Sequence, residues 1–274
     1  MRYEARIRAV AEGDDAVVRV SDASLAVEHA DAVTLYFVAA TNFVSHVDVS
    51  GDEAARVAGY LGKLGARGFP EVRADAVADH AALFSRASLT LPSSPSSLHP
   101  TNVRVRRAQV APDPQMAALA YSFGRYVLIS SSRQGTQPSN LQGIWCGEMN
   151  PSWDCKYTTN INLQMNYWAA DSANLTELSD PLVQLIEELT IQGADVAREH
   201  YGAGGWVMHQ NTDLWRVAAP MDGPTWGTFT TGGAWLVTHL WERYLYTRDM
   251  AFLEKVYPVM KGCVRFFLDF LIEQ

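Results

Sequence analysis

The spacing of apolar residues changes along the chain, and this change limits the folds that the sequence can adopt. From Tyr3 to Ala9 every second residue is apolar and the residues between them are charged, which predicts a half-buried β-strand. From Asp113 onward the apolar residues recur with the period of an α-helix. We therefore expect a multidomain α+β protein in which strands come first and helices follow.

Three more short strands are predicted in the first part of the chain, where polar residues separate short apolar runs. They cover residues 16–20, 24–27 and 33–39. Four strands leave a sheet edge and a sheet face uncovered. We therefore interpret residues 1–50 as an incomplete β domain and expect the chain to be part of a longer protein.

Residues 51–100 have the pattern of a connecting layer. Two alanine-rich stretches predict helices over 52–64 and 71–84, and a short strand is predicted over 87–91. The proline- and serine-rich stretch 92–100 is typical of a domain boundary. Residues 101–274 then form the third predicted region.

The third region is expected to consist of paired antiparallel helices, because short connections between amphipathic helices make neighbours run in opposite directions. Asp113 and Pro114 fit an N-cap followed by proline in the first helical position. A short hairpin near 206–209 is also predicted. The last helix ends in apolar residues that no later element covers, which is a second indication of a partial domain. The predicted helices cover residues 113–130, 163–173, 179–200, 229–246 and 249–272.

Composition excludes several classes of partner. The net charge of −8 is spread along the chain without a stripe of lysine and arginine, which argues against binding to nucleic acid or to an anionic membrane. No run of eighteen apolar residues occurs. Cys146, Cys155 and Cys263 form no C-x-x-C pair and cannot all be paired with one another, so neither a zinc knuckle nor a disulfide framework is indicated. An uncharged ligand and no cofactor fit this composition.

Asn160 and Asn162 are the sharpest local feature of the chain. Residues two apart in an extended segment point to the same side, so these two carboxamides could hold one carboxylate or one water molecule. The alternative is that Asn160 caps the following helix and Asn162 binds loop backbone. The residues alone leave both interpretations open.

A second polar cluster lies between Trp206 and Trp215. Mixed aromatic, amide and carboxylate loops suit carbohydrates, because sugar rings stack on tryptophan and their hydroxyls need paired donors and acceptors. For His209 the alternative is a buried structural imidazole, and no metal-ligand spacing is evident around it. The carboxylates available for acid or base chemistry show no pair that stands out by spacing; they are Glu148, Asp154, Asp213 and Asp222. The glycines that follow Trp226 match no nucleotide-binding fingerprint.

Five stretches make the chain resemble glycoside hydrolase family 95, the inverting α-L-fucosidases. The resemblance implies an N-terminal β-sandwich domain, a helical linker and an (α/α)6 barrel, of which this chain would hold the C-terminal part of the sandwich, the linker and about half of the barrel. The substrate would be a fucosylated oligosaccharide or glycan. The stretches are Gly124–Arg133, Asn140–Trp145, Lys156–Trp168, His209–Trp215 and Gly232–Leu236.

The resemblance also implies roles for individual residues. Asn160 and Asn162 correspond to two asparagines that assist an aspartate general base, whereas the general acid and the general base lie beyond position 274. The isolated chain is therefore expected to be inactive. The cellular location stays open, although an extracytoplasmic or secreted location fits many relatives. The predicted substrate contacts are Thr101, Trp145, His209, Asn211, Asp213, Trp215 and Trp226.

Two departures from the family pattern leave the activity open. Cys146 stands where asparagine is common, and Pro100–Arg104 keeps only part of an expected motif. An α-L-galactosidase differs by the acceptance of one hydroxyl group, which a single side chain can control. A non-catalytic carbohydrate-binding relic, or a helical toroid with lyase or phosphorylase chemistry, would also fit the sequence.

Overall fold

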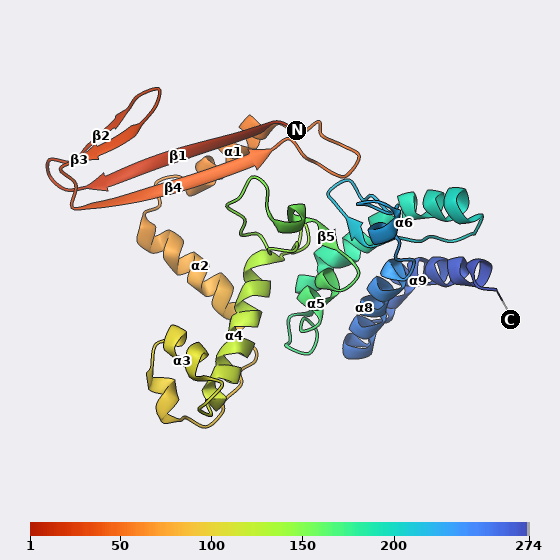
Figure 1. Ribbon diagram of the computed structural model, residues 1–274. Helices are drawn as coiled ribbons and strands as arrows, with labels where there is room; N and C mark the ends of the chain where they lie inside the picture. The colour runs from red at the N-terminus through yellow and green to blue at the C-terminus, as the bar shows by residue number, and fades with distance from the viewer. Residues whose placement is uncertain (273–274) are drawn as a thin grey trace. The chain divides into compact units, whose positions relative to one another are not determined.

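The computed structural model describes residues 1–272, and the chain divides into two compact units, Met1–Asp79 and His80–Gln274. The first unit contains the predicted strands and the second contains most of the helices (Figure 1). The mixed α and β character is thus confirmed. The sandwich and barrel assignments, and the division at residues 50 and 100, stay predictions.

The first unit contains all four predicted strands. β1 (Tyr3–Glu12) pairs with β4 (Ala32–Thr41) in antiparallel register from Tyr3 opposite Thr41 to Glu12 opposite Ala32. β2 (Val17–Val20) and β3 (Leu25–Glu28) form a hairpin between them. The predicted half-buried face is wrong for this structure, because Ile7 is 54% exposed and Phe37 is 65% exposed.

Helix α1 (Glu53–Leu64) packs against β1 and β4, and its ends follow from local sequence. Asp52 caps the helix by accepting a hydrogen bond from the Ala55 amide at 2.9 Å. Gly65 ends it with a positive φ of 58°. Helix α2 (Phe69–Phe84) follows, so both helices predicted for the connecting region are confirmed.

The strand predicted over 87–91 is wrong. These residues form no regular structure, and the backbone there accepts side-chain hydrogen bonds instead. The buried Arg125 donates to the carbonyls of Leu83 and Ala87, at 3.0 and 2.7 Å, and also to that of Phe84. The Arg125 guanidinium thereby provides hydrogen bonds for the last two carbonyls of α2 and for one carbonyl of the loop that follows it.

The second unit has the predicted helices with small shifts. The helix after Asn162 ends at Tyr167 and continues as turns, and a short helix at residues 101–107 was not predicted. Asp113 stands at the N-cap of α4, but its carboxylate pairs with Arg104 at 2.7 Å instead of capping the helix. The elements are α3 (Thr101–Arg107), α4 (Pro114–Ser131), α5 (Asn162–Tyr167), α6 (Asp180–Tyr201), α7 (Pro224–Gly227), α8 (Gly232–Thr247) and α9 (Met250–Phe270), with short 3-10 turns at Pro95–Leu98, Ser152–Cys155 and Thr176–Ser179. None of the helices in residues 1–272 has the length and apolar character needed to cross a bilayer.

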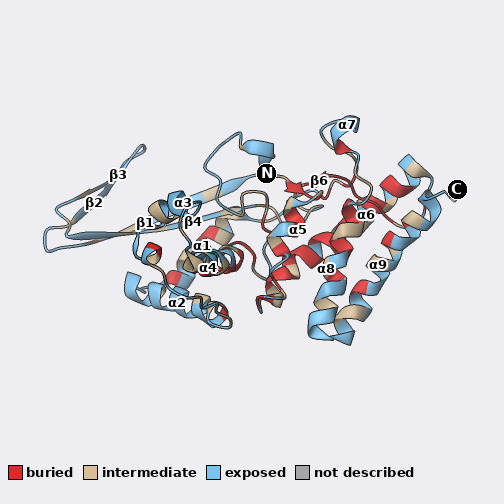
Figure 2. Cartoon of the chain, turned by 60° about the horizontal axis from the view of Figure 1, so that its bottom comes forward, coloured by how far each residue is buried: buried red, intermediate tan, exposed pale blue. Residues whose placement is uncertain are grey.

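The core of the second unit lies where α6, α8 and α9 meet, and buried residues concentrate there (Figure 2). The indole of Trp206 is 3% exposed and donates to the Val259 carbonyl of α9 at 2.8 Å. Two glycines make room for it: a Cβ on Gly233 of α8 would lie 2.8 Å from the indole, and one on Gly262 of α9 would lie 2.9 Å from it. The indole therefore sets how closely these helices approach.

This packing predicts that Gly233→Ala lowers the free energy of unfolding by about 1–3 kcal/mol, because the added methyl group overpacks the indole. Gly124→Ala on α4 is the matched control, since a Cβ there meets nothing within 4 Å. It is expected to raise the free energy of unfolding by up to about 1 kcal/mol. Urea unfolding of both variants measures the difference, and equal effects would contradict the proposed fit.

Candidate functional site

A two-stranded ribbon joins the two polar segments that the sequence singles out. β5 (Tyr157–Thr158) pairs with β6 (Asn211–Thr212), with Thr158 opposite Asn211. Thr159 extends the pairing, because its amide donates to the Gln210 carbonyl at 2.6 Å and its hydroxyl donates to the His209 carbonyl at 2.5 Å. The hairpin predicted near 206–209 is therefore wrong, and the strand at 211–212 pairs with a distant segment instead.

Asn160 and Asn162 follow the ribbon directly, at the start of α5. Asn160 lies in a turn and Asn162 is the first helical residue, so the prediction of an extended Asn-x-Asn segment is wrong. The N-cap position belongs to Ile161, which makes no side-chain cap. Within residues 1–272 neither carboxamide forms a hydrogen bond, and both residues are half-buried. The capping alternative for Asn160 is not seen.

Several buried polar atoms beside these asparagines lack partners in the described part of the chain. They lie on the ribbon and on the first turn of α5. Buried polar atoms are nearly always hydrogen-bonded, so such a group is a candidate place for ordered water or ligand hydroxyls. The atoms are Thr158 Oγ1, Asn211 Oδ1, Thr212 Oγ1 and Gln164 Oε1.

A network of ion pairs and hydrogen bonds between side chains fixes one side of the ribbon. The Asp222 carboxylate accepts from Lys156 Nζ at 2.7 Å through one oxygen and from Asn211 Nδ2 at 2.8 Å through the other. Lys156 also lies 3.3 Å from Asp154. Burial acts to lower the pKa of Lys156, but its contacts with Asp222 and Asp154 outweigh burial and hold this pKa above its usual value. The sequence pointed to Asp222 only as a possible acid or base, because spacing does not reveal its bridging position.

Two cavities flank the ribbon and share Asn140 and Tyr157. The first has a volume of about 320 Å³ and the second about 370 Å³, which is the size of a small-molecule site. Asp213 and Trp215 line the first, together with Lys156. The second is bordered by the segment from Ser130 to Ile144. Both combine aromatic and apolar surface with carboxylate, ammonium or hydroxyl groups.

The buried Arg216 holds the wall that carries Asp213 and Trp215. It is 1% exposed, and its Nε lies 2.7 Å from Glu188 of α6. Its Nη2 donates to Gln137 Oε1 at 2.6 Å, and its Nη1 donates to the Asp213 carbonyl at 3.1 Å. Sequence reasoning missed this residue, since a lone arginine in a loop gives no signal of burial.

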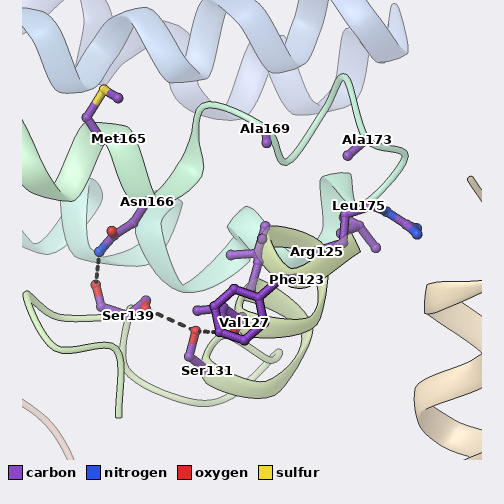
Figure 3. Close-up of a pocket in the computed structure, with 12 residues that line it drawn as sticks. Phe123, Arg125, Val127, Ser131, Ser139, Met165, Asn166, Ala169, Ala173 and Leu175 are labelled. Carbon is purple, nitrogen blue, oxygen red and sulfur yellow. Dashed lines mark hydrogen bonds between the residues drawn. The ribbon is translucent and has the colours of Figure 1, made fainter. Parts of the chain in front are cut away.

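The loop at Asn140 is anchored to α5. Asn166 Nδ2 donates to the carbonyls of Ser139 and Asn140 at 3.2 and 3.0 Å, beside a third cavity of about 300 Å³ between α4 and α5 (Figure 3). The Ser139 hydroxyl donates to that of Ser131 at 3.0 Å. This third cavity is largely apolar and lies apart from the ribbon.

The remaining predicted contacts occupy different environments. Trp145 is 50% exposed, with its ring against Gly143 of the second cavity. Trp226 is 73% exposed on α7, and Thr101 is exposed at the start of α3; neither lines the two cavities at the ribbon. In residues 1–272 no group of three or more histidine, cysteine, aspartate or glutamate residues could hold a metal ion.

His209 is fully buried, and both of its ring nitrogens are engaged. Nδ1 accepts from the Phe229 amide at 3.0 Å, and Nε2 lies 3.0 Å from the Tyr201 hydroxyl. Burial, with a smaller effect of His200, lowers the pKa of His209 to about 4. This geometry favours the structural alternative for His209, and its contact with substrate stays a prediction.

The buried imidazole predicts a loss of stability in mild acid. Its pKa in the folded chain lies below the unfolded value of about 6.5, so its neutral form stabilises the fold fully above pH 6.5 and this contribution is lost as the pH falls toward 4. Urea unfolding at pH 7.5 and pH 5 is expected to show a smaller pH dependence in His209→Gln than in the unchanged chain. The exposed His99 offers the control, and a His99→Gln variant with the same reduced dependence would contradict the assignment.

Comparison with known proteins identifies the family. The model described as Glycosyl hydrolase family 95 catalytic domain matches residues 68–274. Alpha-L-fucosidase 2 of Arabidopsis thaliana is 40% identical over 260 residues, which is 91% of this chain and 31% of the relative. Probable alpha-fucosidase A of Aspergillus niger is 35% identical over 211 residues, which is 76% of this chain and 27% of the relative.

The chain thus spans under a third of the length of these relatives. The matched region includes the ribbon, the two asparagines and both flanking cavities. The predicted resemblance is therefore confirmed: the chain belongs to glycosyl hydrolase family 95.

Proposed function

We propose that the protein containing this chain hydrolyses terminal α-L-fucosides of oligosaccharides or glycans, with inversion at the anomeric carbon. Two relatives named as α-fucosidases support the sugar class. The observation that carries the proposal is the group of partnerless polar atoms on the ribbon, next to cavities lined by Trp215 and Asp213. A deoxy sugar offers an apolar C–H face and several hydroxyls, which matches this mixture.

The two asparagines have a specific role in this proposal. An inverting glycosidase needs a base that activates water on the face of the sugar opposite the leaving group. The Asn160 and Asn162 carboxamides are free of other partners in the described residues, so they are available to orient that water and to hold the base carboxylate. Their amide groups do not titrate and would act by position alone.

The cavity at Trp215 suits the sugar itself. Trp215 is 39% exposed and provides an aromatic surface for the C–H face of a ring. Lys156 Nζ and the Asp213 carboxylate line the same cavity and offer a donor and acceptors for sugar hydroxyls. The contact between Lys156 and Asp222 keeps the ammonium group in place.

The general acid and general base are assigned to polypeptide outside this chain. The loop carboxylates Asp154, Asp213 and Asp222 are engaged with Lys156, with backbone amides or with Asn211. A general acid or base must reach the reacting group directly, whereas these contacts direct the three carboxylates toward the protein. The 274-residue chain would then supply the part of the site that binds sugar and orients water.

In the intact enzyme, Asn162→Ala is expected to lower kcat about 100-fold, because misplacing the attacking water raises the barrier of the chemical step. KM should change little, since the interaction develops at the transition state. Asn150→Ala, at an exposed asparagine of the neighbouring loop, is the matched control and should keep full activity. Steady-state kinetics with an aryl α-L-fucoside measure both variants, and unchanged kcat in Asn162→Ala would remove the proposed role.

The isolated chain is expected to bind fucosyllactose without hydrolysing it, because loss of a general acid or base costs about 10² to 10⁴ in rate. Calorimetry measures the binding, and release of aryl alcohol from the α-L-fucoside measures turnover. Robust turnover by the isolated chain would refute the assignment of acid and base. Tighter binding of the α-L-galactoside than of the α-L-fucoside would instead identify an α-L-galactosidase.

A further inference from the structure

Tyr157 lies at the junction of the two cavities that flank the ribbon. Its side chain lines both the first cavity, which contains Trp215, and the second, which the segment from Ser130 to Ile144 borders. Tyr157 is 6% exposed, and its hydroxyl forms no hydrogen bond within residues 1–272. Burial raises the pKa of Tyr157 to about 12, so the hydroxyl keeps its proton throughout the neutral range. Such a hydroxyl, on a buried residue and without a partner in the protein, is a candidate to bind a ligand.

Backbone pairing holds the two residues that the cavities share. Tyr157 pairs with Thr212 in the ribbon. Asn140 pairs with Gly143, and its carbonyl accepts from Asn166 Nδ2 at 3.0 Å. The junction therefore has a fixed position before a ligand arrives, which limits the conformational entropy that binding costs.

The second cavity offers further polar groups that lack partners in the described part of the chain. The Ser130 hydroxyl, on its wall, forms no hydrogen bond there. Asn140 Oδ1 accepts from the Gln142 amide at 3.0 Å, which leaves Asn140 Nδ2 without a partner in the same residues. Gln137 Oε1 likewise accepts from Arg216, which leaves Gln137 Nε2 as a donor. Hydroxyl and amide groups of this kind are what sugar hydroxyls need as partners.

Charge distinguishes the two cavities, and their sizes are similar. Asp154, Asp213 and Lys156 line the first, whereas no aspartate or glutamate is among the described residues that line the second. Arg133 lines the second, and its Nε donates to the Ile129 carbonyl at 2.7 Å. The volumes of about 320 and 370 Å³ lie near the lower end of the range for small-molecule sites, about 300 to 1,000 Å³. Each cavity therefore suits one sugar ring, and the second suits an uncharged one.

We propose that one glycan occupies both cavities across Tyr157, with the fucose ring in the first cavity and the adjoining sugar of the leaving group in the second. The Tyr157 hydroxyl donates a hydrogen bond to this glycan where the two rings meet. Two rings joined through one glycosidic oxygen lie next to each other, as do two cavities that share lining residues. This inference rests on the hydrolytic function proposed above, and it specifies a substrate whose leaving group is itself a sugar.

In the intact enzyme, Tyr157→Phe removes the hydroxyl and keeps the ring. The KM for fucosyllactose is expected to rise about 2- to 10-fold with kcat unchanged, as loss of one neutral hydrogen bond to the bound substrate would give. The midpoint of thermal unfolding should stay the same, because the hydroxyl has no partner among the described residues. Steady-state kinetics and a thermal melt measure both effects, and an unchanged KM would overturn the role of Tyr157.

A substrate with a very small leaving group tests the second cavity separately. α-L-Fucosyl fluoride would leave that cavity empty, whereas fucosyllactose would fill it. Ser130→Ala is expected to lower the ratio of kcat/KM for fucosyllactose to kcat/KM for the fluoride about 2- to 10-fold. Met149→Ala is the matched control, since Met149 is 96% exposed on the neighbouring loop and lines neither cavity. Its ratio should equal that of the unchanged enzyme.

The outcomes separate this inference from the function on which it rests. If the unchanged enzyme releases fucose from neither substrate, the hydrolytic function is refuted and this inference with it. If it hydrolyses both and Ser130→Ala keeps the same ratio, only the placement of the leaving-group sugar is refuted. An equal fall of the ratio in Met149→Ala would also refute that placement, because the effect would not be specific to the cavity wall.

Discussion

The packing of Trp206 between α6, α8 and α9 is the interaction on which the second unit depends. Its indole sits against glycines of all three helices, at Gly193, Gly233 and Gly262. The backbone on either side is tied to the same helices, because the Trp206 amide donates to Gly262 and the Val207 amide donates to Gly193. The chain leaving this anchor runs directly into His209 and β6, so the position of the site follows from the packing of the core.

The ribbon of β5 and β6 connects the segment anchored at Trp206 to the candidate site. Only two residues on each side form strand pairs, yet Thr159 and Gln164 add hydrogen bonds that carry the contact into α5. The ribbon thus connects the packed core at Trp206 with the group of polar side-chain atoms that lack partners. Such a division is common where a rigid scaffold presents a binding surface, since a polar group left without a partner in the protein is free for a ligand.

Sequence reasoning predicted the long elements well and the connections poorly. Helices α4, α6, α8 and α9 have apolar periods that extend over many residues, so they can be located without the structure. The strands of the first unit were also located correctly, but the buried face expected for β1 was not found. The strand expected over 87–91 failed because the buried Arg125, distant in sequence, donates a hydrogen bond to the Ala87 carbonyl at its start. The extended form expected for Asn160 and Asn162 failed because α5 begins within that pair.

Some residues of the candidate site could be predicted from the sequence, but the contacts between them could not. Asp213 and Trp215 were found from a cluster of residue types, and the cavity contains both. The bridge from Lys156 through Asp222 to Asn211 joins residues far apart in the chain, and no local pattern encodes such a link. The family resemblance supplied roles that spacing alone left open.

The interior position of Arg216 has a consequence for how a ligand is received. Its guanidinium links Glu188 of α6, Gln137 after α4 and the backbone of Asp213. Displacing the segment that carries Asp213 and Trp215 would separate the buried Arg216 guanidinium from the Glu188 carboxylate, which is energetically costly. When a ligand enters, the exposed side chains of this segment should therefore adjust while its backbone stays in place. Because the backbone is already fixed, little conformational entropy should be lost on binding.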